Sequence, residues 1–440
     1  MNIIEAIRQA GVVGAGGAGF PTHMKLAVQA KRVLVNGAEC EPLLRADQLA
    51  MCHQAARVVR GLELAMEAAS APEGVIVTKA HYHEAVEALR KELAEKPHIT
   101  LHLMESYYPS GDEKNVIYEV TGQIVPTGKL PIDLGCVVIN VGTAIGIADA
   151  VDGIPVTDKW VTLGGEVPMP MTVSVPIGSS MREVLKLSGF EGQEKDYGLI
   201  VGGPLMGTLA ESWDAPVTKT TGGLLVFRRT HPLMIRRSLP LERQIKLARS
   251  ICCQCNRCTQ LCPRHSLGLP VEPHKAMRTL FTGSAASLGN AAGVLACSGC
   301  GLCTNFACEM GLAPSLVMNA LKQALTAAGV RPVPEENLRP DSGLALKNVP
   351  VKRLMARMGL TAYDKAAPYG EKPFLPKEVT LMLRQHVGSP AKPTIKQGDR
   401  VQRGQEIASI PKNALGAALH ASISGTVTQV TEEYIRIAGE

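Results

Sequence analysis

The chain has 440 residues, more than one hydrophobic core usually accommodates, so we expect about three or four domains. Hydrophobic residues make up 45% of it and charged residues 20%, a composition typical of globular proteins. A net charge of +6 with only 4% aromatic residues argues against a nucleic-acid-binding protein, which needs a concentrated basic patch or stacking aromatic side chains.

The N-terminal residues do not read as a targeting segment. Residues 1–8 carry an acid at Glu5 and lack the basic, apolar and small-residue order of a signal peptide. The longest weakly polar stretch, residues 136–148, contains Asn140 and Thr143 and is too short to span a bilayer. We therefore expect a cytoplasmic protein with reduced cysteines, no membrane span and no nucleic-acid partner.

The first 155 residues alternate between helical and strand-like segments. Residues 2–10 read as a short helix, and a glycine-rich loop at 11–21 opens a second helix at Thr22. Strands are expected at 32–36, 74–78, 99–104 and 137–141, and helices at 46–70, 82–95 and 112–121. Strands that alternate with helices predict a parallel α/β layer.

The pattern changes after residue 155. Residues 156–230 are rich in short strands and predict a small α+β domain, while residues 240–330 are helical around two groups of cysteines. Residues 331–377 are rich in proline and read as a linker, and residues 378–440 read as β-structure with glycine turns.

The cysteine spacing is that of a two-cluster ferredoxin. The first run is Cys252-x2-Cys255-x2-Cys258-x3-Cys262-Pro263, and the second is Cys297-x2-Cys300-x2-Cys303-x4-Cys308. In such runs three close cysteines wrap one [4Fe-4S] cluster and the fourth ligates the other cluster. The first ligand set is therefore Cys252, Cys255, Cys258 and Cys308, and the second is Cys297, Cys300, Cys303 and Cys262.

Three other uses of these cysteines are less favoured. Structural zinc usually takes cysteines in separated pairs, disulfides need an oxidising compartment, and a c-type haem needs a Cys-x2-Cys-His sequence that does not occur. Cys253 is not expected to be a ligand, because counting from it would require a ligand at position 256, which is Asn256. Cys40, Cys52 and Cys136 are expected to be buried apolar fillers.

The glycine-rich loop is a candidate phosphate site. Residues 14–19 place four glycines in six positions directly before a helix, so that backbone N–H groups are bared for an anion. A tight turn without a ligand is the alternative. The loop precedes the first strand, which distinguishes it from the dinucleotide-binding fingerprint.

Four motifs in order over the first 150 residues carry a family resemblance. They are the glycine loop with Lys25, the run Asn36-Gly37-Ala38-Glu39-Cys40-Glu41-Pro42, the run 108–114 and the run 140–144. Together they resemble the flavin- and NADH-binding subunit of respiratory complex I and, more closely, the C subunit of the Rnf complex. Residues 157–228 look like that family's β-grasp (SLBB) domain, and the two cluster motifs match the Rnf-type subunit.

The C-terminal residues refine this resemblance. Residues 396–427 are similar to the barrel-sandwich hybrid domain that begins Rnf C subunits, but here they follow the clusters. That order resembles the cobalamin reductase family of propanediol utilisation. The resemblance implies a multidomain α/β protein with a Rossmann-like FMN/NADH domain (1–155), a β-grasp SLBB-like domain (156–230), a helical ferredoxin domain (240–330), a linker (331–377) and a barrel-sandwich hybrid domain (378–440).

The resemblance also implies roles for particular residues. Glu113 and Glu39 would act at the hydride site, as its catalytic residues. The other cofactor-binding positions are Gly14, Gly16, Gly17, Gly19 and Lys25 for the FMN phosphate, Asn36, Asn140 and Thr143 for the flavin, and Glu41, Tyr108, Gly111 and Asp112 for the flavin and nicotinamide pocket. A role of Glu39 and Glu41 as helix caps remains open. The chain departs from complex I at Ala15, where complex I has Arg, at Ala38, where it has Asp, and after Lys25, where no aromatic residue follows.

The function implied is that of an NADH-dependent flavo-iron-sulfur reductase. NADH would pass electrons to FMN, then to two [4Fe-4S] clusters and to cob(II)alamin, giving cob(I)alamin for adenosylation in 1,2-propanediol degradation. A corrinoid adenosyltransferase and microcompartment shell proteins would be partners, in the cytoplasm or inside a bacterial microcompartment. Two alternatives remain: an Rnf-type subunit that reduces ferredoxin or feeds a membrane complex, and a cluster-bearing electron-transfer scaffold without NADH oxidation.

Overall fold

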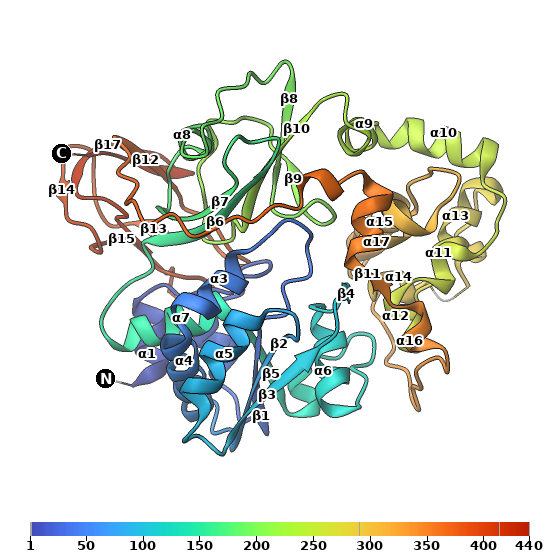
Figure 1. Ribbon diagram of the computed structural model, residues 1–440, viewed down its shortest axis with the longest axis horizontal. Helices are drawn as coiled ribbons and strands as arrows, with labels where there is room; N and C mark the ends of the chain where they lie inside the picture. The colour runs from blue at the N-terminus through green and yellow to red at the C-terminus, as the bar shows by residue number, and fades with distance from the viewer. Residues whose placement is uncertain (1, 290, 413, 440) are drawn as a thin grey trace.

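The computed structural model describes residues 2–289, 291–412 and 414–439. In Figure 1 an N-terminal sheet, in blue and cyan, lies below a second sheet in green. The cysteine-bearing helices, in yellow, and the C-terminal strands, in red, lie on opposite sides of the second sheet. None of the helices in the described part of the chain has the length and apolar character needed to cross a bilayer.

A four-stranded parallel sheet forms the N-terminal unit, in the order β3-β2-β1-β5. Its strands are β1 (Arg32–Asn36), β2 (Glu73–Lys79), β3 (Ile99–Met104) and β5 (Cys136–Asn140). Val33 and Val35 of β1 face one apolar core and Leu34 faces another, so both sides are buried and the expected parallel α/β layer is confirmed. Because the strand order reverses at β1, the carboxyl ends of β1 and β5 border a crevice, the usual ligand position in open α/β sheets.

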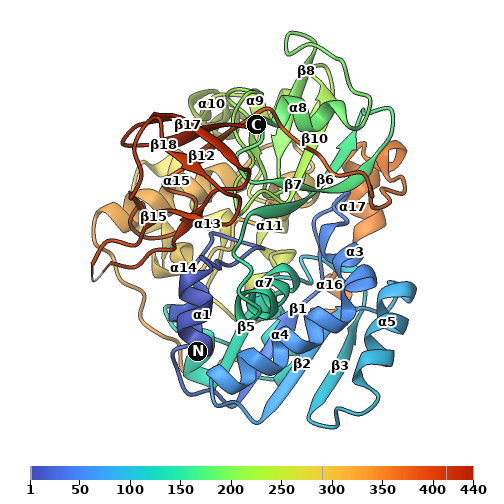
Figure 2. The same ribbon diagram turned by 90° about the vertical axis from the view of Figure 1, so that its left-hand side faces the viewer.

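Helices cover both faces of this sheet, and Figure 2 shows those on the face that points toward the viewer. On the Val33 side pack α1 (Ile3–Gln9), α4 (Ala55–Ala68), α5 (His83–Leu93) and α7 (Val141–Val151), and on the Leu34 side packs α6 (Glu113–Thr121). Gly61 lets α4 and α7 approach, since a Cβ atom there would lie 1.9 Å from the carbonyl oxygen of Ala144. This packing fixes the N-terminus of α7 beside the crevice.

The helix expected over 46–70 is divided. It consists of α3 (Ala46–His53) and α4, because Gln54 has φ −131° and ψ 31°, outside the helical region. The helix expected from Thr22 is the short α2 (Thr22–Leu26). We expected the helix from Thr22 to present its N-terminus to a phosphate. The N-terminus of the longer α7 is better suited to that role.

The second unit is a mixed five-stranded sheet in the order β7-β6-β10-β8-β9. Its strands are β6 (Asp158–Gly165), β7 (Met171–Pro176), β8 (Tyr197–Val201), β9 (Thr208–Leu209) and β10 (Gly223–Arg228). β6 and β10 are parallel, the other pairs are antiparallel, and α8 (Met181–Lys186) packs against the sheet through Val184 and Leu185. The turn between β8 and β9, residues 202–207, reaches the N-terminal unit and is called the 202–207 loop below.

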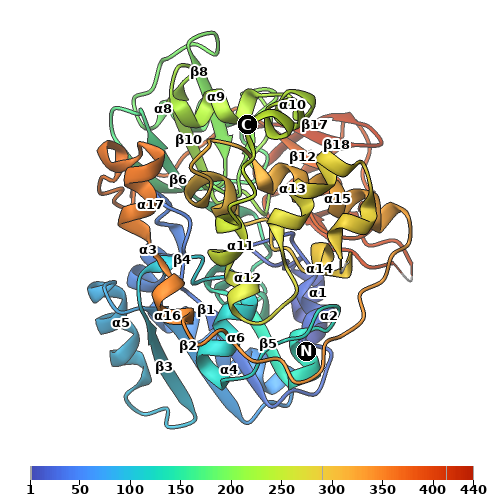
Figure 3. The same cartoon turned by 90° about the vertical axis from the view of Figure 1, so that its right-hand side faces the viewer.

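The cysteines of the two runs lie among a group of helices. These helices are α9 (Pro232–Ser238), α10 (Leu241–Ile251), α11 (Arg257–Gln260), α12 (Pro263–Ser266), α13 (Pro273–Thr282), α14 (Ala292–Leu295) and α15 (Pro314–Ala327). Of these, α10, α13, α14 and α15 share one apolar core around Met277 and Met318. A π-helical turn spans Cys303–Ala307. In Figure 3, α12 lies close to α6 of the N-terminal unit, with α16 (Leu344–Lys347) beside them.

The segment expected as a linker packs against the N-terminal unit and against the core around Cys300. Strand β11 (Val349–Pro350) pairs with β4 (Tyr107–Tyr108) of the N-terminal unit, with Val349 opposite Tyr108. Helix α17 (Val351–Met358) follows and buries Leu354 and Met355 in a core that also contains Tyr108 and Cys300. A partner some 240 positions away cannot be recognised from a two-residue strand.

The C-terminal unit consists of two small sheets around a core that includes Ile407 and Ile437. One sheet has the order β12-β18-β17-β14, with β12 (Glu378–Met382), β14 (Arg400–Val401), β17 (Gly425–Val430) and β18 (Tyr434–Gly439). The other has the order β13-β15-β16, with β13 (Lys392–Pro393), β15 (Glu406–Ser409) and β16 (Leu419–His420). This unit touches the glycine loop, because Val387 N donates to Ala18 O over 3.1 Å.

Lys219 joins three of these units. Its side chain is 3% exposed, and Nζ donates to the carbonyl oxygens of Gly11 at 2.7 Å and Ala418 at 2.8 Å. Burial lowers the pKa of Lys219 to about 7. The neutral amine has two N–H groups, which suffice for these two acceptors.

Replacing Lys219 should remove a pH dependence of stability. Between pH 7 and the ordinary lysine value of 10.5 the unfolded chain binds a proton that the folded chain lacks. The free energy of unfolding therefore rises with pH across this window. Guanidinium unfolding at about pH 7.5 and about pH 9.5 should show this rise in the wild type and a flatter response in Lys219→Met. Lys186→Met, at an exposed site, is the control, and an unchanged slope in Lys219→Met would contradict the assignment.

Candidate flavin and iron-sulfur sites

The glycine loop lies against the start of α7. Ala15 N donates to Thr143 Oγ1 over 2.9 Å, and Asn140 caps the helix by accepting from Gly142 N at 2.8 Å. A Cβ atom on Gly16 would lie 2.8 Å from Asn140 Nδ2, whereas one on Gly17 would meet nothing within 4 Å. The loop thus leaves open space at Gly17 in front of a helix N-terminus, which fits a phosphate group.

The other motif residues of the N-terminal unit converge at the carboxyl ends of the strands. Asn36, at the end of β1, donates through Nδ2 to Gly111 O at 2.9 Å and accepts from the backbone N of Ala38 at 3.1 Å. Lys25 Nζ lies 3.1 Å from Glu113 Oε1, which links the segment after the glycine loop to the first turn of α6. The structure therefore brings the Lys25, Asn36, Gly111 and Glu113 positions together.

Glu39 is a buried acid with other charged side chains close to it. Its Oε2 atom has no hydrogen-bond partner among the described residues, and burial, with the nearby Asp47 carboxylate, raises the pKa of Glu39 to about 8. Asp47 accepts from Asn140 Nδ2 over 2.6 Å. An acid with an unpaired oxygen in a mostly enclosed position is costly, so it indicates a place for a ligand that can form a hydrogen bond with it.

Two lysines near this acid were not foreseen from the sequence. Lys79 ends β2 and is 2% exposed, and burial lowers its pKa. Lys159 Nζ donates to Ala15 O at 3.0 Å, and burial lowers its pKa to about 8. Lys79 could have been found from its place at the end of an apolar parallel strand. Lys159 carries no such signal, because it reaches the glycine loop from the second sheet.

Glu41, Tyr108 and Asp112 hold the N-terminal unit against the rest of the chain. Glu41 accepts from the backbone N–H groups of Leu205 at 2.9 Å and Met206 at 3.0 Å. The Tyr108 hydroxyl lies 3.0 Å from Glu41 Oε1 and 2.6 Å from Cys300 O. These side chains, expected around the flavin and nicotinamide, thus reach the 202–207 loop and the cysteine segment.

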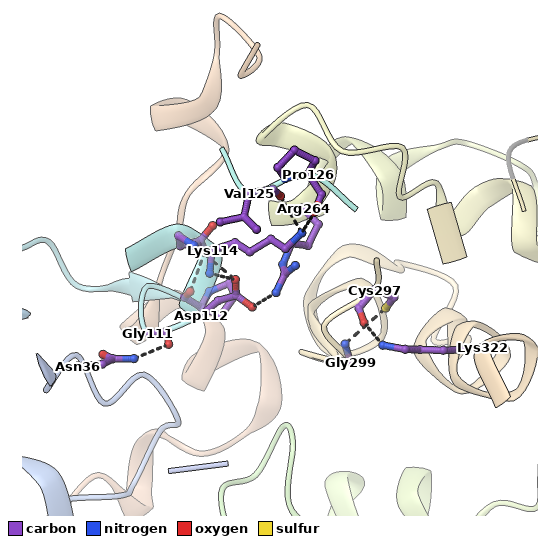
Figure 4. Close-up of polar contacts among 12 residues, drawn as sticks. Asn36, Gly111, Asp112, Lys114, Val125, Pro126, Arg264, Cys297, Gly299 and Lys322 are labelled. Carbon is purple, nitrogen blue, oxygen red and sulfur yellow. Dashed lines mark hydrogen bonds and ion pairs between the residues drawn. The ribbon is translucent and has the colours of Figure 1, made fainter. Parts of the chain in front are cut away.

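Asp112 makes a second contact with the cysteine segment. It accepts from Lys114 N at 3.1 Å as the N-cap of α6, and its other oxygen pairs with Arg264 Nη2 at 2.7 Å (Figure 4). The side chains of Asp112 and Arg264 are only 10% and 12% exposed. Lys114 donates to the carbonyl oxygens of Val125 and Pro126, which fixes the same side of α6.

The cysteines of the first predicted ligand set form the wall of a surface cavity, and we call them the outer set (Cys252, Cys255, Cys258 and Cys308). The cavity measures about 110 Å³, and Cys253 and Met310 also line it. Cys253 and Cys255 are exposed. Four thiols around one hollow fit an iron-sulfur cluster bound near the surface.

The second predicted ligand set lies deeper, and we call it the inner set (Cys262, Cys297, Cys300 and Cys303). Cys262 is 9% and Cys300 is 8% exposed. Gly299 N approaches Cys297 Sγ to 3.4 Å, and Lys322 Nζ donates to Cys297 O at 2.7 Å (Figure 4). N–H groups directed at cluster sulfurs help to set reduction potentials.

The chemistry of both sets fits clusters better than single ions. Burial raises the pKa of Cys258 and of Cys300 to about 12, so these thiols ionise only when metal charge compensates them. Within the described residues, no three histidine, cysteine or acidic side chains lie close enough to hold one metal ion. The cysteines of a cubane cluster bind separate iron atoms and need not converge on one point.

Gly17→Val should weaken FMN binding. The glycine has an ordinary backbone conformation and open space at its Cβ position, so the valine fills the proposed phosphate seat without straining the fold. We expect FMN affinity to fall at least about tenfold, equivalent to roughly 1.4 kcal/mol. Flavin fluorescence titration measures it, with cluster content as the control for folding. Wild-type FMN affinity would argue against this loop.

Metal analysis tests the two ligand sets. Anaerobically prepared protein should hold about eight iron and eight labile sulfide per chain. Cys255→Ala should lose one cluster, whereas Cys253→Ala, its exposed neighbour in the same cavity, should keep both. About four iron in the wild type, stoichiometric zinc, or equal losses in the two variants would contradict the assignment.

Three family models match the chain. Residues 7–149 match the Nuo51 FMN-binding domain, residues 251–313 the 4Fe-4S dicluster domain and residues 369–439 the RnfC barrel sandwich hybrid domain. The expected FMN and cluster cofactors, and the position of the barrel-sandwich domain after the clusters, are therefore confirmed.

Curated relatives match over almost the whole length. Cobalamin reductase PduS of Salmonella typhimurium is 46% identical over 438 residues, which cover 99% of this chain and 96% of the relative. The Citrobacter freundii protein of that name is 44% identical with the same coverage. The C subunit of the Na(+)-translocating ferredoxin:NAD(+) oxidoreductase complex of Acetobacterium woodii is 37% identical, and the match covers 60% of this chain and 58% of that protein.

A solved structure shares the fold. The NAD+-reducing [NiFe]-hydrogenase in the H2-reduced state superposes with a TM-score of 0.50 at 22% identity, over 72% of this chain and 60% of that chain. At that identity the likeness concerns the fold alone. The curated relatives, at 46% and 44% identity over 99% of this chain, show the family: the chain belongs to the family of the cobalamin reductase PduS.

Proposed function

We propose that this protein is an NADH-dependent reductase that delivers electrons through FMN and two [4Fe-4S] clusters to cob(II)alamin, giving cob(I)alamin for adenosylation. The observation that carries the proposal is the direct contact, within one chain, between the FMN-binding unit and the cluster-ligand segment at Tyr108 and Cys300. Bound FMN accepts two electrons as hydride and releases them singly, which suits a one-electron acceptor such as Co(II).

Different residues would bind the FMN phosphate, surround the flavin and orient the nicotinamide. The loop of Gly14, Gly16, Gly17 and Gly19, with Lys25 behind it, would hold the phosphate, while Asn36, Asn140 and Thr143 order the strand ends around the flavin. Glu113 would orient the nicotinamide, and its ion pair with Lys25 holds the carboxylate at the mouth of the crevice. Glu39, protonated below about pH 8, would donate a hydrogen bond toward the ligand.

The finer domain assignments belong to the same proposal. The parallel sheet with its switch point between β1 and β5 supports a Rossmann-like FMN/NADH domain over 1–155. The mixed sheet with α8 packed on it supports a β-grasp SLBB-like domain over 156–230. The helical domain would span 240–330 and the barrel-sandwich domain 378–440, with 331–377 as a packed connection between them.

Cobalamin would be reduced beside the outer set. That cavity opens at the surface and is lined by the exposed Met310, and the exposed Ile251 directly precedes Cys252 in the chain. A corrinoid adenosyltransferase would present the cobalamin there and trap the cob(I)alamin as it forms. Shell proteins of a microcompartment would be the further partners, in the cytoplasm or in its lumen.

Loss of the cluster at the inner set should stop cobalamin reduction but leave flavin reduction by NADH intact. In Cys300→Ala we expect NADH still to bleach the flavin, while formation of adenosylcobalamin with a transferase present falls to background. Cys253→Ala is the control that keeps both activities. If cobalamin reduction survives loss of the clusters, reduced free flavin is the carrier. If ferredoxin is reduced and cobalamin is not, the protein is an Rnf-type reductase.

A further inference from the structure

Two polar contacts join the FMN-binding unit to the cluster segment. Among the described residues, the hydrogen bonds and ion pairs between residues 1–155 and residues 251–313 are those of Tyr108 with Cys300 and of Asp112 with Arg264. Cys300 belongs to the inner set, and Arg264 lies two residues after Cys262, a second member of that set. Both contacts therefore reach the inner set and neither reaches the outer set.

The Tyr108 contact is built into the core. Tyr108 is 1% exposed, and its hydroxyl lies between Cys300 O at 2.6 Å and Glu41 Oε1 at 3.0 Å. A phenol has one proton, which Cys300 O and Glu41 Oε1 share, and the shorter distance places it nearer to the Cys300 carbonyl. The strand pair of Tyr108 with Val349 fixes the backbone that carries the ring.

Glu41 fixes the hydroxyl from the side of the 202–207 loop. Its carboxylate accepts from Leu205 N and Met206 N, and a Cβ atom on Gly203 would approach Glu41 Oε2 to 2.0 Å. Arg237 holds the same loop by donating to the carbonyl oxygens of Pro204, Leu205 and Gly207, at 2.6 to 2.8 Å. The loop is thus held between Glu41 and Arg237 of α9.

The two ligand sets differ in access to solvent and adjoin each other. The outer set lines a surface cavity and includes the exposed Cys255, whereas Cys262 and Cys300 of the inner set are buried. Helix α11, which carries Cys258, packs against the π-helical turn that begins at Cys303. An electron on the inner set would have a short protein path to the outer set.

From this arrangement we propose that Tyr108 and Glu41 are positioning residues that hold the inner set against the flavin, so that electrons enter at the inner cluster and leave from the outer cluster. This order deepens the proposed function and rests on it. One NADH gives NAD+, one proton and two electrons, and the two clusters take one electron each. The flavin is thereby restored before an acceptor arrives.

Single-cluster variants test the order of transfer without an acceptor. Cys255→Ala keeps the inner cluster and Cys300→Ala keeps the outer one, and reduction by dithionite confirms by EPR that each remaining cluster is present. Mixed with NADH and freeze-quenched, Cys255→Ala should reduce its inner cluster at the wild-type rate. The outer cluster of Cys300→Ala should be reduced about a hundredfold more slowly, because its donor is missing.

The outcomes separate the two proposals. If the flavin is not bleached by NADH in the wild type, the proposed function fails. If it is bleached but the outer cluster of Cys300→Ala is reduced at the wild-type rate, the order proposed here is wrong. The same holds if the inner cluster of Cys255→Ala stays oxidised.

Variants that keep all eight ligands test the positioning residues. In Tyr108→Phe the Cys300 carbonyl loses its donor, so the EPR-monitored midpoint potential of the inner cluster should shift while that of the outer cluster stays. Tyr107→Phe is the matched control, because the Tyr107 hydroxyl donates to Glu119 on α6 rather than to a cysteine carbonyl. Glu41→Gln should shift the same potential as Tyr108→Phe. Equal potentials in Tyr108→Phe and the wild type would overturn the role assigned to Tyr108.

Discussion

The hydrogen bond from Tyr108 to the carbonyl oxygen of Cys300 is the contact on which the arrangement of this protein depends. It joins the last residue of strand β4 in the N-terminal unit to a loop that carries a cluster ligand, 192 positions later in the chain. The 202–207 loop, strand β11 and helix α17 pack around this hydrogen bond, in one core that also contains Cys300. Four parts of the chain thus meet where a flavin and a cluster must lie close to exchange electrons.

The parallel sheet supplies the second constraint. Its strand order places the ends of β1 and β5 at one crevice, and the close approach of α4 and α7 at Gly61 fixes the helix that begins there. The glycine loop reaches this helix from the N-terminus of the chain, and the C-terminal unit contacts the loop from outside. The barrel-sandwich domain therefore supports the flavin site by contact, although it lies at the far end of the sequence.

Much of this could be predicted from the sequence, since it is encoded locally. Ligand spacing divides the cysteines into two sets, apolar runs mark the strands, and the glycines of residues 14–19 mark the phosphate loop. The roles of Glu41, Tyr108 and Asp112 could not be predicted, because their partners Leu205, Cys300 and Arg264 lie more than 150 positions away. Likewise, Lys159 reaches the glycine loop from another domain, and the break at Gln54 has no glycine or proline to announce it.

Anomalous diffraction at the iron edge, from crystals of the holoprotein grown without oxygen, tests the central claim most directly. It should show two separate iron clusters, one at Cys262, Cys297, Cys300 and Cys303 and one in the cavity of Cys252, Cys255, Cys258 and Cys308, with the flavin density nearer to the first. One cluster only, or a flavin nearer to the surface cavity, would contradict the account.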